Sequence, residues 1–211
     1  MIPSYQFRLI VKPLLFFAMA WPGVWVILQW RYARRGLSHE LGFNPVEYIH
    51  HYTGDWAIYF LLIGLAISPL SRIKQMRQLI SMRRMVGLFA AFYVVLHILG
   101  YLWLDLRFDM RDFLQDILKR NYITVGVIAF LMLIPLVLTS TKFAMRGMGA
   151  RAWKRLHTLV YWITGLALMH FFMMRKGFQL EPLIFIGIYL ILMSFRWKPN
   201  WLKLLFKSKI A

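Results

Sequence analysis

The chain has 211 residues, of which 60% are hydrophobic and 17% aromatic, and its mean hydropathy is +0.58. This composition excludes an ordinary soluble domain and predicts an integral membrane protein with a single domain over residues 1–211. Cysteine does not occur. Disulfides, iron–sulfur clusters, thiolate-ligated haem, thiol catalysis and covalent haem attachment are therefore excluded.

The formal net charge is +18, a value that would suit a nucleic-acid-binding protein. The basic residues, however, lie in short segments between long apolar runs. Positively charged loops of this kind determine the orientation of membrane proteins in the bilayer. We therefore expect no nucleic-acid partner and interpret the charge as a signal of membrane topology.

The first apolar run predicts a membrane-spanning helix over residues 14–30, which Pro22-Gly23 would kink. Residues 1–12 contain no small-residue cleavage site, so we expect this helix to be retained and not removed as a signal peptide. Asn44-Pro45-Val46-Glu47 is typical of a helix start, with Asn as N-cap and Glu completing a capping box. That second helix would extend to about residue 68 and place His50 and His51 near the membrane interface.

A basic loop over residues 71–84 precedes the third span, which extends to about residue 104 and contains His97. Residues 105–121 predict an amphipathic surface helix. The fourth span covers residues 122–138, and a second basic loop covers 141–155. The fifth span runs from His157 to about residue 174 and contains His170, and a sixth runs from residue 182 to about 197.

Six spans would form an all-α bundle with both chain ends on the same side of the membrane. Of the 26 Lys and Arg residues, 17 fall on that side, whereas all eight acidic residues fall on the other side. The positive-inside rule then predicts that both termini are cytoplasmic.

Histidine inside an apolar span suggests a functional site, because an ionisable side chain is costly in hydrocarbon unless it has a partner. Both the third and the fifth span run outward, which places His97 and His170 at a similar depth in the outer half of the bilayer. Two imidazoles at one depth suit the axial coordination of a haem iron. With no open iron position, such a haem favours electron transfer.

His157 lies thirteen residues before His170, about 20 Å along a helix, and therefore near the cytoplasmic end. At this level the third span has Arg83 and Arg84 where a second bis-histidine site would need histidine. The residues predict one haem. Two further possibilities stay equally open: a second, inner haem with His157 as a ligand, or a flavin at the same level.

Other polar residues have simpler interpretations. His39 and His50 are typical of polar residues at the membrane boundary. For His51, a boundary position and a role in cofactor binding are equally compatible with the sequence. Arg83, Arg84 and Lys142 are chiefly topology determinants, with pairing to haem propionates or a flavin phosphate as the alternative.

Short motifs in a fixed order from about Gly42 to Trp197 resemble the MsrQ (YedZ) family and, more distantly, the ferric-reductase-like transmembrane domain shared with NADPH oxidases. The motifs are Asn44-Pro45, His51-Tyr52-Thr53-Gly54, Ile67-Ser68-Pro69-Leu70, Arg83-Arg84-Met85-Val86-Gly87-Leu88, Leu96-His97, Leu138-Thr139-Ser140-Thr141, Trp153-Lys154-Arg155-Leu156-His157 and His170.

The resemblance implies a haem b protein of the bacterial inner membrane that passes electrons to MsrP, a periplasmic molybdopterin enzyme that reduces methionine sulfoxide in oxidised proteins. It implies FMN as a further cofactor, and a quinone or a cytosolic flavin reductase as electron donor. By position, His97 and His170 look like ligands of one haem, His157 like a further ligand or cofactor contact, and His51 like a family histidine that supports haem or shapes the docking surface.

Two departures from the oxidases are visible. The third span lacks their second histidine, and the C-terminal FAD/NADPH domain is missing, so the resemblance implies that electrons come from another molecule. A ferric-chelate or quinone reductase with the same core remains an alternative function. A transporter or structural membrane protein that uses histidines as polar contacts is a second one, and it predicts a colourless purified protein.

Overall fold

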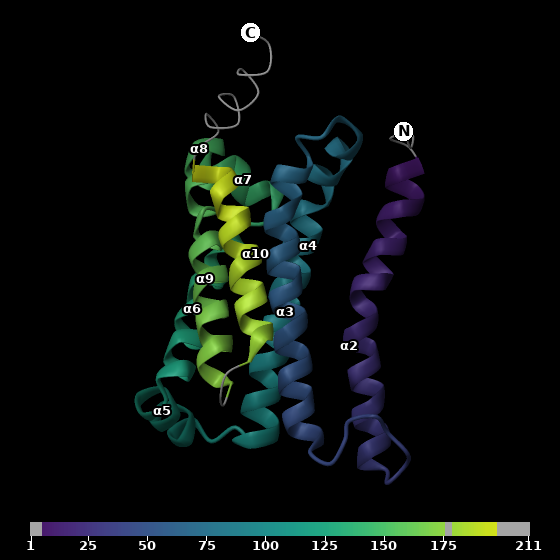
Figure 1. Ribbon diagram of the computed structural model, residues 1–211, viewed down its shortest axis with the longest axis vertical. Coiled ribbons are helices and arrows are strands. Elements are labelled where there is room, and N and C mark those ends of the chain that lie inside the picture. Colours follow the sequence, from purple (N-terminus) through teal and green to yellow (C-terminus); the bar gives the residue numbers. More distant parts are fainter. Residues whose placement is uncertain (1–5, 176–178, 198–211) are drawn as a thin grey trace.

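A computed structural model describes residues 6–175 and 179–197, and the described residues contain helices and no strands. Figure 1 shows long helices standing side by side, with short ones at the two ends of the bundle. The elements in chain order are η1 (Phe7–Val11), α2 (Lys12–Arg34), α3 (Pro45–Leu70), η2 (Lys74–Met82), α4 (Arg83–Gly100), η3 (Tyr101–Asp105), α5 (Met110–Lys119), α6 (Asn121–Leu138), α7 (Lys142–Met148), α8 (Ala150–Leu156), α9 (Leu159–Met174) and α10 (Leu180–Trp197).

Two helix pairs form the centre of the bundle. α3 packs along α4, and α6 packs along α9, while α10 lies against α9 and α3. In Figure 1, α2 begins and α10 ends at the upper end of the bundle, where η2, α7 and α8 also lie. We call the opposite end, which carries α5 and the connection from α2 to α3, the lower end.

Within residues 6–175 and 179–197, five segments are long and apolar enough to cross a membrane, so the chain is a multi-pass membrane protein. They are Leu9–Arg34, Pro45–Leu70, Lys74–Asp105, Asn121–Leu138 and Ala150–Met174. α10 is helical but is not among these five. The sixth span and the cytoplasmic position of both termini therefore stay predictions.

The predicted start of the second helix is confirmed. The Glu47 backbone N–H donates to the Asn44 side chain at 3.3 Å, and the Asn44 amide donates to the Glu47 carboxylate at 3.0 Å. The prediction of plain loops over residues 71–84 and 141–155 was wrong, because η2 occupies the first segment, and α7 and α8 occupy the second. Gly149, with φ of 81°, separates α7 from α8 in a backbone conformation that glycine adopts at little cost.

Pro22 interrupts the hydrogen-bond ladder of α2, and a side chain of α4 compensates. The Gly23 N–H donates to the Tyr93 hydroxyl at 2.8 Å, and this hydroxyl donates to the Met19 carbonyl at 2.8 Å. In an uninterrupted helix these two backbone groups would pair directly. Tyr93 is completely buried, so its hydroxyl joins α2 to α4 through groups that no water reaches.

We predict that Tyr93→Phe destabilises the protein by about 1–2 kcal/mol, because it leaves two buried backbone groups without a partner. Thermal unfolding in detergent would measure the loss. Tyr32→Phe, at an exposed position of α2, is the matched control and should leave the midpoint unchanged. Equal midpoints for Tyr93→Phe and the wild type would contradict this role of the hydroxyl.

The topology can be tested with single cysteines, because the natural chain has none. Phe43 in the α2–α3 connection and Phe143 in α7 are both highly exposed and lie toward opposite ends of the bundle. We expect a membrane-impermeant maleimide to label Phe43→Cys in intact spheroplasts, and Phe143→Cys and Ser208→Cys only after lysis. Labelling of Ser208→Cys before lysis would show that α10 does not return the chain to the cytoplasm.

Candidate functional site

A cavity of about 1020 Å³ lies near the lower end of the bundle, between the α3–α4 pair and the α6–α9 pair. Its volume is at the upper limit for small-molecule and cofactor sites. Aliphatic and aromatic side chains make up most of its wall. Four histidines also line it: His50, His51, His97 and His170.

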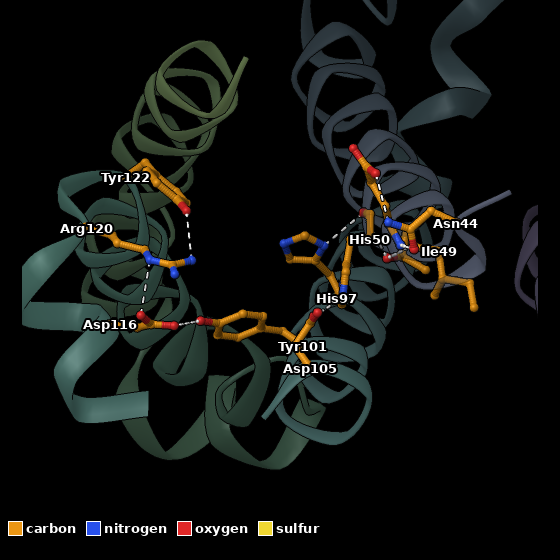
Figure 2. Close-up of polar contacts among 11 residues, drawn as sticks. Asn44, Ile49, His50, His97, Tyr101, Asp105, Asp116, Arg120 and Tyr122 are labelled. Carbon is orange, nitrogen blue, oxygen red and sulfur yellow. Dashed lines mark hydrogen bonds and ion pairs between the residues drawn. The ribbon is translucent and has the colours of Figure 1, made fainter. Parts of the chain in front are cut away.

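His97 on α4 and His170 on α9 face each other in this cavity. Their ring centroids are 6.2 Å apart, and the ring planes cross at 81°. His97 therefore reaches the same depth as His170, as the spacing within the two spans predicted. In Figure 2, the His97 ring points away from its own helix across the opening toward the Arg120–Tyr122 segment.

Both rings are oriented through Nδ1 by a backbone carbonyl of the neighbouring helix. His97 Nδ1 lies 3.1 Å from the His50 carbonyl oxygen, and His170 Nδ1 lies 2.6 Å from the Tyr122 carbonyl oxygen. Because a carbonyl only accepts, each Nδ1 must carry the proton and donate. Each Nε2 is then the unprotonated nitrogen, which is the form that binds a metal.

A glycine stands four residues after each of these carbonyls, and it gives the imidazole room to approach. A Cβ at Gly54 would lie 3.4 Å from His97 Nδ1, and a Cβ at Gly126 would lie only 2.9 Å from His170 Nδ1. A larger side chain at residue i+4 would cover the carbonyl of residue i on the helix surface. The same local arrangement therefore occurs twice, once in α3 and once in α6.

The donor set fits a metal that a macrocycle already holds. Two imidazoles on opposite sides of one metal ion have ring centroids about 6 Å apart, because each metal–nitrogen bond is about 2 Å long. Among the described residues, no cluster of three or more His, Asp or Glu could hold a bare metal ion. A porphyrin supplies four nitrogen ligands itself, so two axial histidines complete the coordination of its iron.

A polar rim closes one side of the cavity, where α5 meets the start of α6 (Figure 2). The Tyr101 hydroxyl donates to the Asp116 carboxylate, and Asp116 pairs with Arg120 Nε at 3.1 Å. Arg120 Nη1 also lies 3.4 Å from the Tyr122 hydroxyl, and this contact raises the pKa of the Arg120 guanidinium above its ordinary value. Like any guanidinium at neutral pH, Arg120 carries a full positive charge at the rim.

His50 and His51 both line the cavity, but only His51 was predicted as a site residue. His51 Nε2 lies 3.8 Å from a Glu47 carboxylate oxygen. His50 is more than the boundary residue that its position suggested, because it pairs with Asp105 through Nε2 and orients His97 through its carbonyl. Sequence reasoning missed this role because no side-chain pattern shows which backbone carbonyl a distant residue contacts.

The other predicted site residues lie at the upper end of the bundle and do not line the cavity. His157 lies between α8 and α9, with Nε2 3.1 Å from the Thr139 hydroxyl and its ring stacked on Trp153 at 3.9 Å between centroids. α9 begins two residues after His157 and ends at Met174, so the predicted fifth span is confirmed, with His157 in the turn that precedes it. Arg83 and Arg84 begin α4, and Lys142 begins α7.

Arg83 is fourteen residues from His97, about 21 Å along the helix. It therefore does not reach the groups around His97 and His170, and the same end of the bundle holds Arg84 and Lys142. If these three cations pair with cofactor carboxylates or phosphates, that cofactor has to lie at the upper end, near His157. Arg120, which sequence reasoning did not select, is the cation that lines the cavity.

The fold and the cavity define a membrane protein of the ferric-reductase-like class, since residues 53–168 match the family described as the ferric reductase like transmembrane component. Closer relatives narrow this class. The protein-methionine-sulfoxide reductase heme-binding subunit MsrQ of Herminiimonas arsenicoxydans is 42% identical over 204 residues, which cover 95% of this chain and 90% of that protein. The chain therefore belongs to the MsrQ family.

Two further relatives show how widely this domain is used. The MsrQ subunit of Caulobacter vibrioides is 42% identical over 182 residues, 86% of this chain and 86% of that protein. The magnetosome protein MamZ of Magnetospirillum gryphiswaldense is 39% identical over 185 residues, which cover 88% of this chain but only 28% of MamZ. The same helical unit thus also occurs within a much longer protein.

Proposed function

We propose that the protein is a haem b electron carrier of the bacterial inner membrane. The observation that carries this proposal is the His97–His170 pair, whose rings are 6.2 Å apart in a largely apolar cavity. His97 and His170 would hold the haem, which would supply one-electron redox chemistry there. The names of the MsrQ relatives, which describe heme-binding subunits, agree with this assignment.

The protein contributes orientation and exclusion of water. The two Nδ1–H donors fix both imidazoles, so that each Nε2 is ready to bind iron without reorganisation. The aliphatic wall keeps the surroundings of the iron at low polarity, and that influences its reduction potential.

The direction of transfer follows from the predicted topology. Electrons would come from the quinone pool or a cytosolic flavin reductase and leave at the lower end, which faces the periplasm in this topology. There a molybdopterin partner of the MsrP type would take them and reduce methionine sulfoxide in oxidised proteins. The relatives' names refer to methionine sulfoxide reduction, and the partner would carry out that chemistry.

His157 and the cations near it suit a second cofactor, either an inner haem or FMN. Its Nε2 contacts the hydroxyl of Thr139, the residue that follows α6, and its ring is stacked on Trp153. Arg83 is close enough to act on His157 electrostatically. We propose that Arg83, Arg84 and Lys142 serve the carboxylates or phosphate of this cofactor at the electron entry side.

Absorption spectra test the assignment of the cavity. We expect the purified wild-type protein to show a low-spin b-type spectrum that changes on reduction with dithionite. His97→Ala and His170→Ala should each lose this spectrum, because each removes one of the two axial ligands. His39→Ala, outside the cavity, is the control and should retain it.

His157→Ala separates the one-cofactor and two-cofactor hypotheses. If a second haem or FMN depends on His157, this variant keeps the spectrum of the haem bound by His97 and His170 and loses only the second component. A colourless wild-type protein, expressed with adequate haem supply, would overturn the haem function and leave the histidines as polar contacts of a transporter or structural protein.

Gly126→Ala tests whether the approach of His170 to the Tyr122 carbonyl is needed. The added Cβ would lie 2.9 Å from His170 Nδ1, so the ring must shift and give up its hydrogen bond. We expect haem binding to weaken about tenfold, because loss of such a bond costs roughly 1–2 kcal/mol. Haem content per protein and the rate of haem transfer to apomyoglobin would measure this.

Gly87→Ala is the matched control, because a Cβ at that position of α4 meets no atom within 4 Å. It should bind haem as tightly as the wild type. Normal haem retention in Gly126→Ala would show that the Tyr122 carbonyl is not required to orient His170.

A further inference from the structure

Arg120 is the only Lys or Arg side chain among the described residues that line the cavity. Four acidic residues also line the cavity: Glu47 and Asp55 on α3, Asp105 on η3 and Asp116 on α5, which pairs with Arg120. The α3 wall offers a carboxylate ligand no Lys or Arg among its described residues, whereas the α5–α6 rim offers the Arg120 guanidinium, whose Nε alone pairs with Asp116. The charge distribution therefore favours one orientation of an anionic ligand in the cavity.

The Arg120 guanidinium is held in place but keeps free donors. Nε pairs with Asp116, and Nη1 contacts the Tyr122 hydroxyl, whereas Nη2 has no hydrogen-bond partner within residues 6–175 and 179–197. Guanidinium has five N–H donors in a planar fork that suits a carboxylate. In Figure 2, this group projects into the opening that faces the His97 ring.

Arg120 is also directly linked to the segment that orients an axial histidine. It lies two residues before Tyr122, whose carbonyl accepts from His170 Nδ1. Asp116, which holds Arg120, is itself held by the Tyr101 hydroxyl of η3. The rim thus joins α5, α6 and η3 around a single cation.

We propose that Arg120 binds a propionate carboxylate of the haem and thereby fixes the orientation of the macrocycle between His97 and His170. This inference rests on the haem function proposed above and adds a residue that lies far from the two basic loops. Asp116 and Tyr122 act as positioning residues, because they hold the guanidinium and do not themselves contact the carboxylate.

The test compares haem with its dimethyl ester, which keeps the macrocycle and the iron but has no carboxylate charge. Wild type and Arg120→Gln would each be loaded with either compound, and release to apomyoglobin would be timed. We expect Arg120→Gln to release haem about three- to tenfold faster than the wild type, since the side chain is about half exposed and partly screened by solvent. With the dimethyl ester, the two proteins should release at the same rate.

Arg120→Lys and Arg111→Gln complete the experiment. Arg120→Lys keeps the positive charge and should recover part of the slow release. Arg111→Gln makes the same charge change on an exposed side chain of α5 that does not line the cavity, and it should behave as the wild type. The midpoint potential gives an independent readout, because loss of a cation near the iron should lower it in Arg120→Gln alone.

The outcomes distinguish this inference from the function on which it rests. If wild type binds haem and Arg120→Gln releases haem and its ester with the same increase in rate, Arg120 stabilises the rim and does not bind a propionate. The same holds if Arg111→Gln accelerates release as much as Arg120→Gln. If wild type binds neither compound, the haem function itself is overturned and this inference with it.

Discussion

The site depends on two hydrogen bonds from buried imidazoles to backbone carbonyls of neighbouring helices. α3 orients His97 of α4 through the His50 carbonyl, and α6 orients His170 of α9 through the Tyr122 carbonyl. These are also the two most closely packed helix pairs in the bundle. Each pair therefore presents one oriented ligand, and the cavity lies where the pairs face each other. If either helix pair shifted, both its imidazole and its side of the cavity wall would move.

Glycine makes this arrangement possible at little cost. In an α-helix most carbonyls point along the axis and are covered by the side chain four residues later. Gly54 and Gly126 remove that cover at the two positions where an imidazole must reach the backbone. A single side chain has a comparable role in α2, where the Tyr93 hydroxyl takes the place of the backbone hydrogen bond that Pro22 disturbs. In an apolar bundle, such substitutions keep buried polar groups paired where water cannot reach them.

Charge divides the molecule along its long axis. The upper end carries the two basic segments and His157, while the lower end carries the histidine-lined cavity, the acidic residues and a single cavity-lining cation among the described residues. The basic segments at the upper end can therefore set the membrane topology, while the side chains at the lower end are available to bind a ligand in the cavity. Lys and Arg are abundant in the sequence. Among the described residues that line the cavity, however, Arg120 is the only one of either type.

The sequence by itself determined the five long apolar helices and the ligand candidates, because both depend on local patterns. Apolar runs gave the membrane helices, the Asn44 cap gave the start of α3, and counting residues along two parallel spans was enough to place His97 and His170 at one depth. The motifs between Gly42 and Trp197 also indicated the MsrQ family, and the comparisons confirmed that family.

Only the tertiary structure decided how these elements meet. A contact such as Tyr122 carbonyl to His170 joins residues 48 positions apart, and it depends on the backbone of one helix facing the side chain of another. No periodicity encodes that relation, so His50, Gly126 and Arg120 could not be selected from the chain. The contact of His157 with the Thr139 hydroxyl was hidden for the same reason, because it joins the start of α9 to the end of α6 and appears only when the helices are packed.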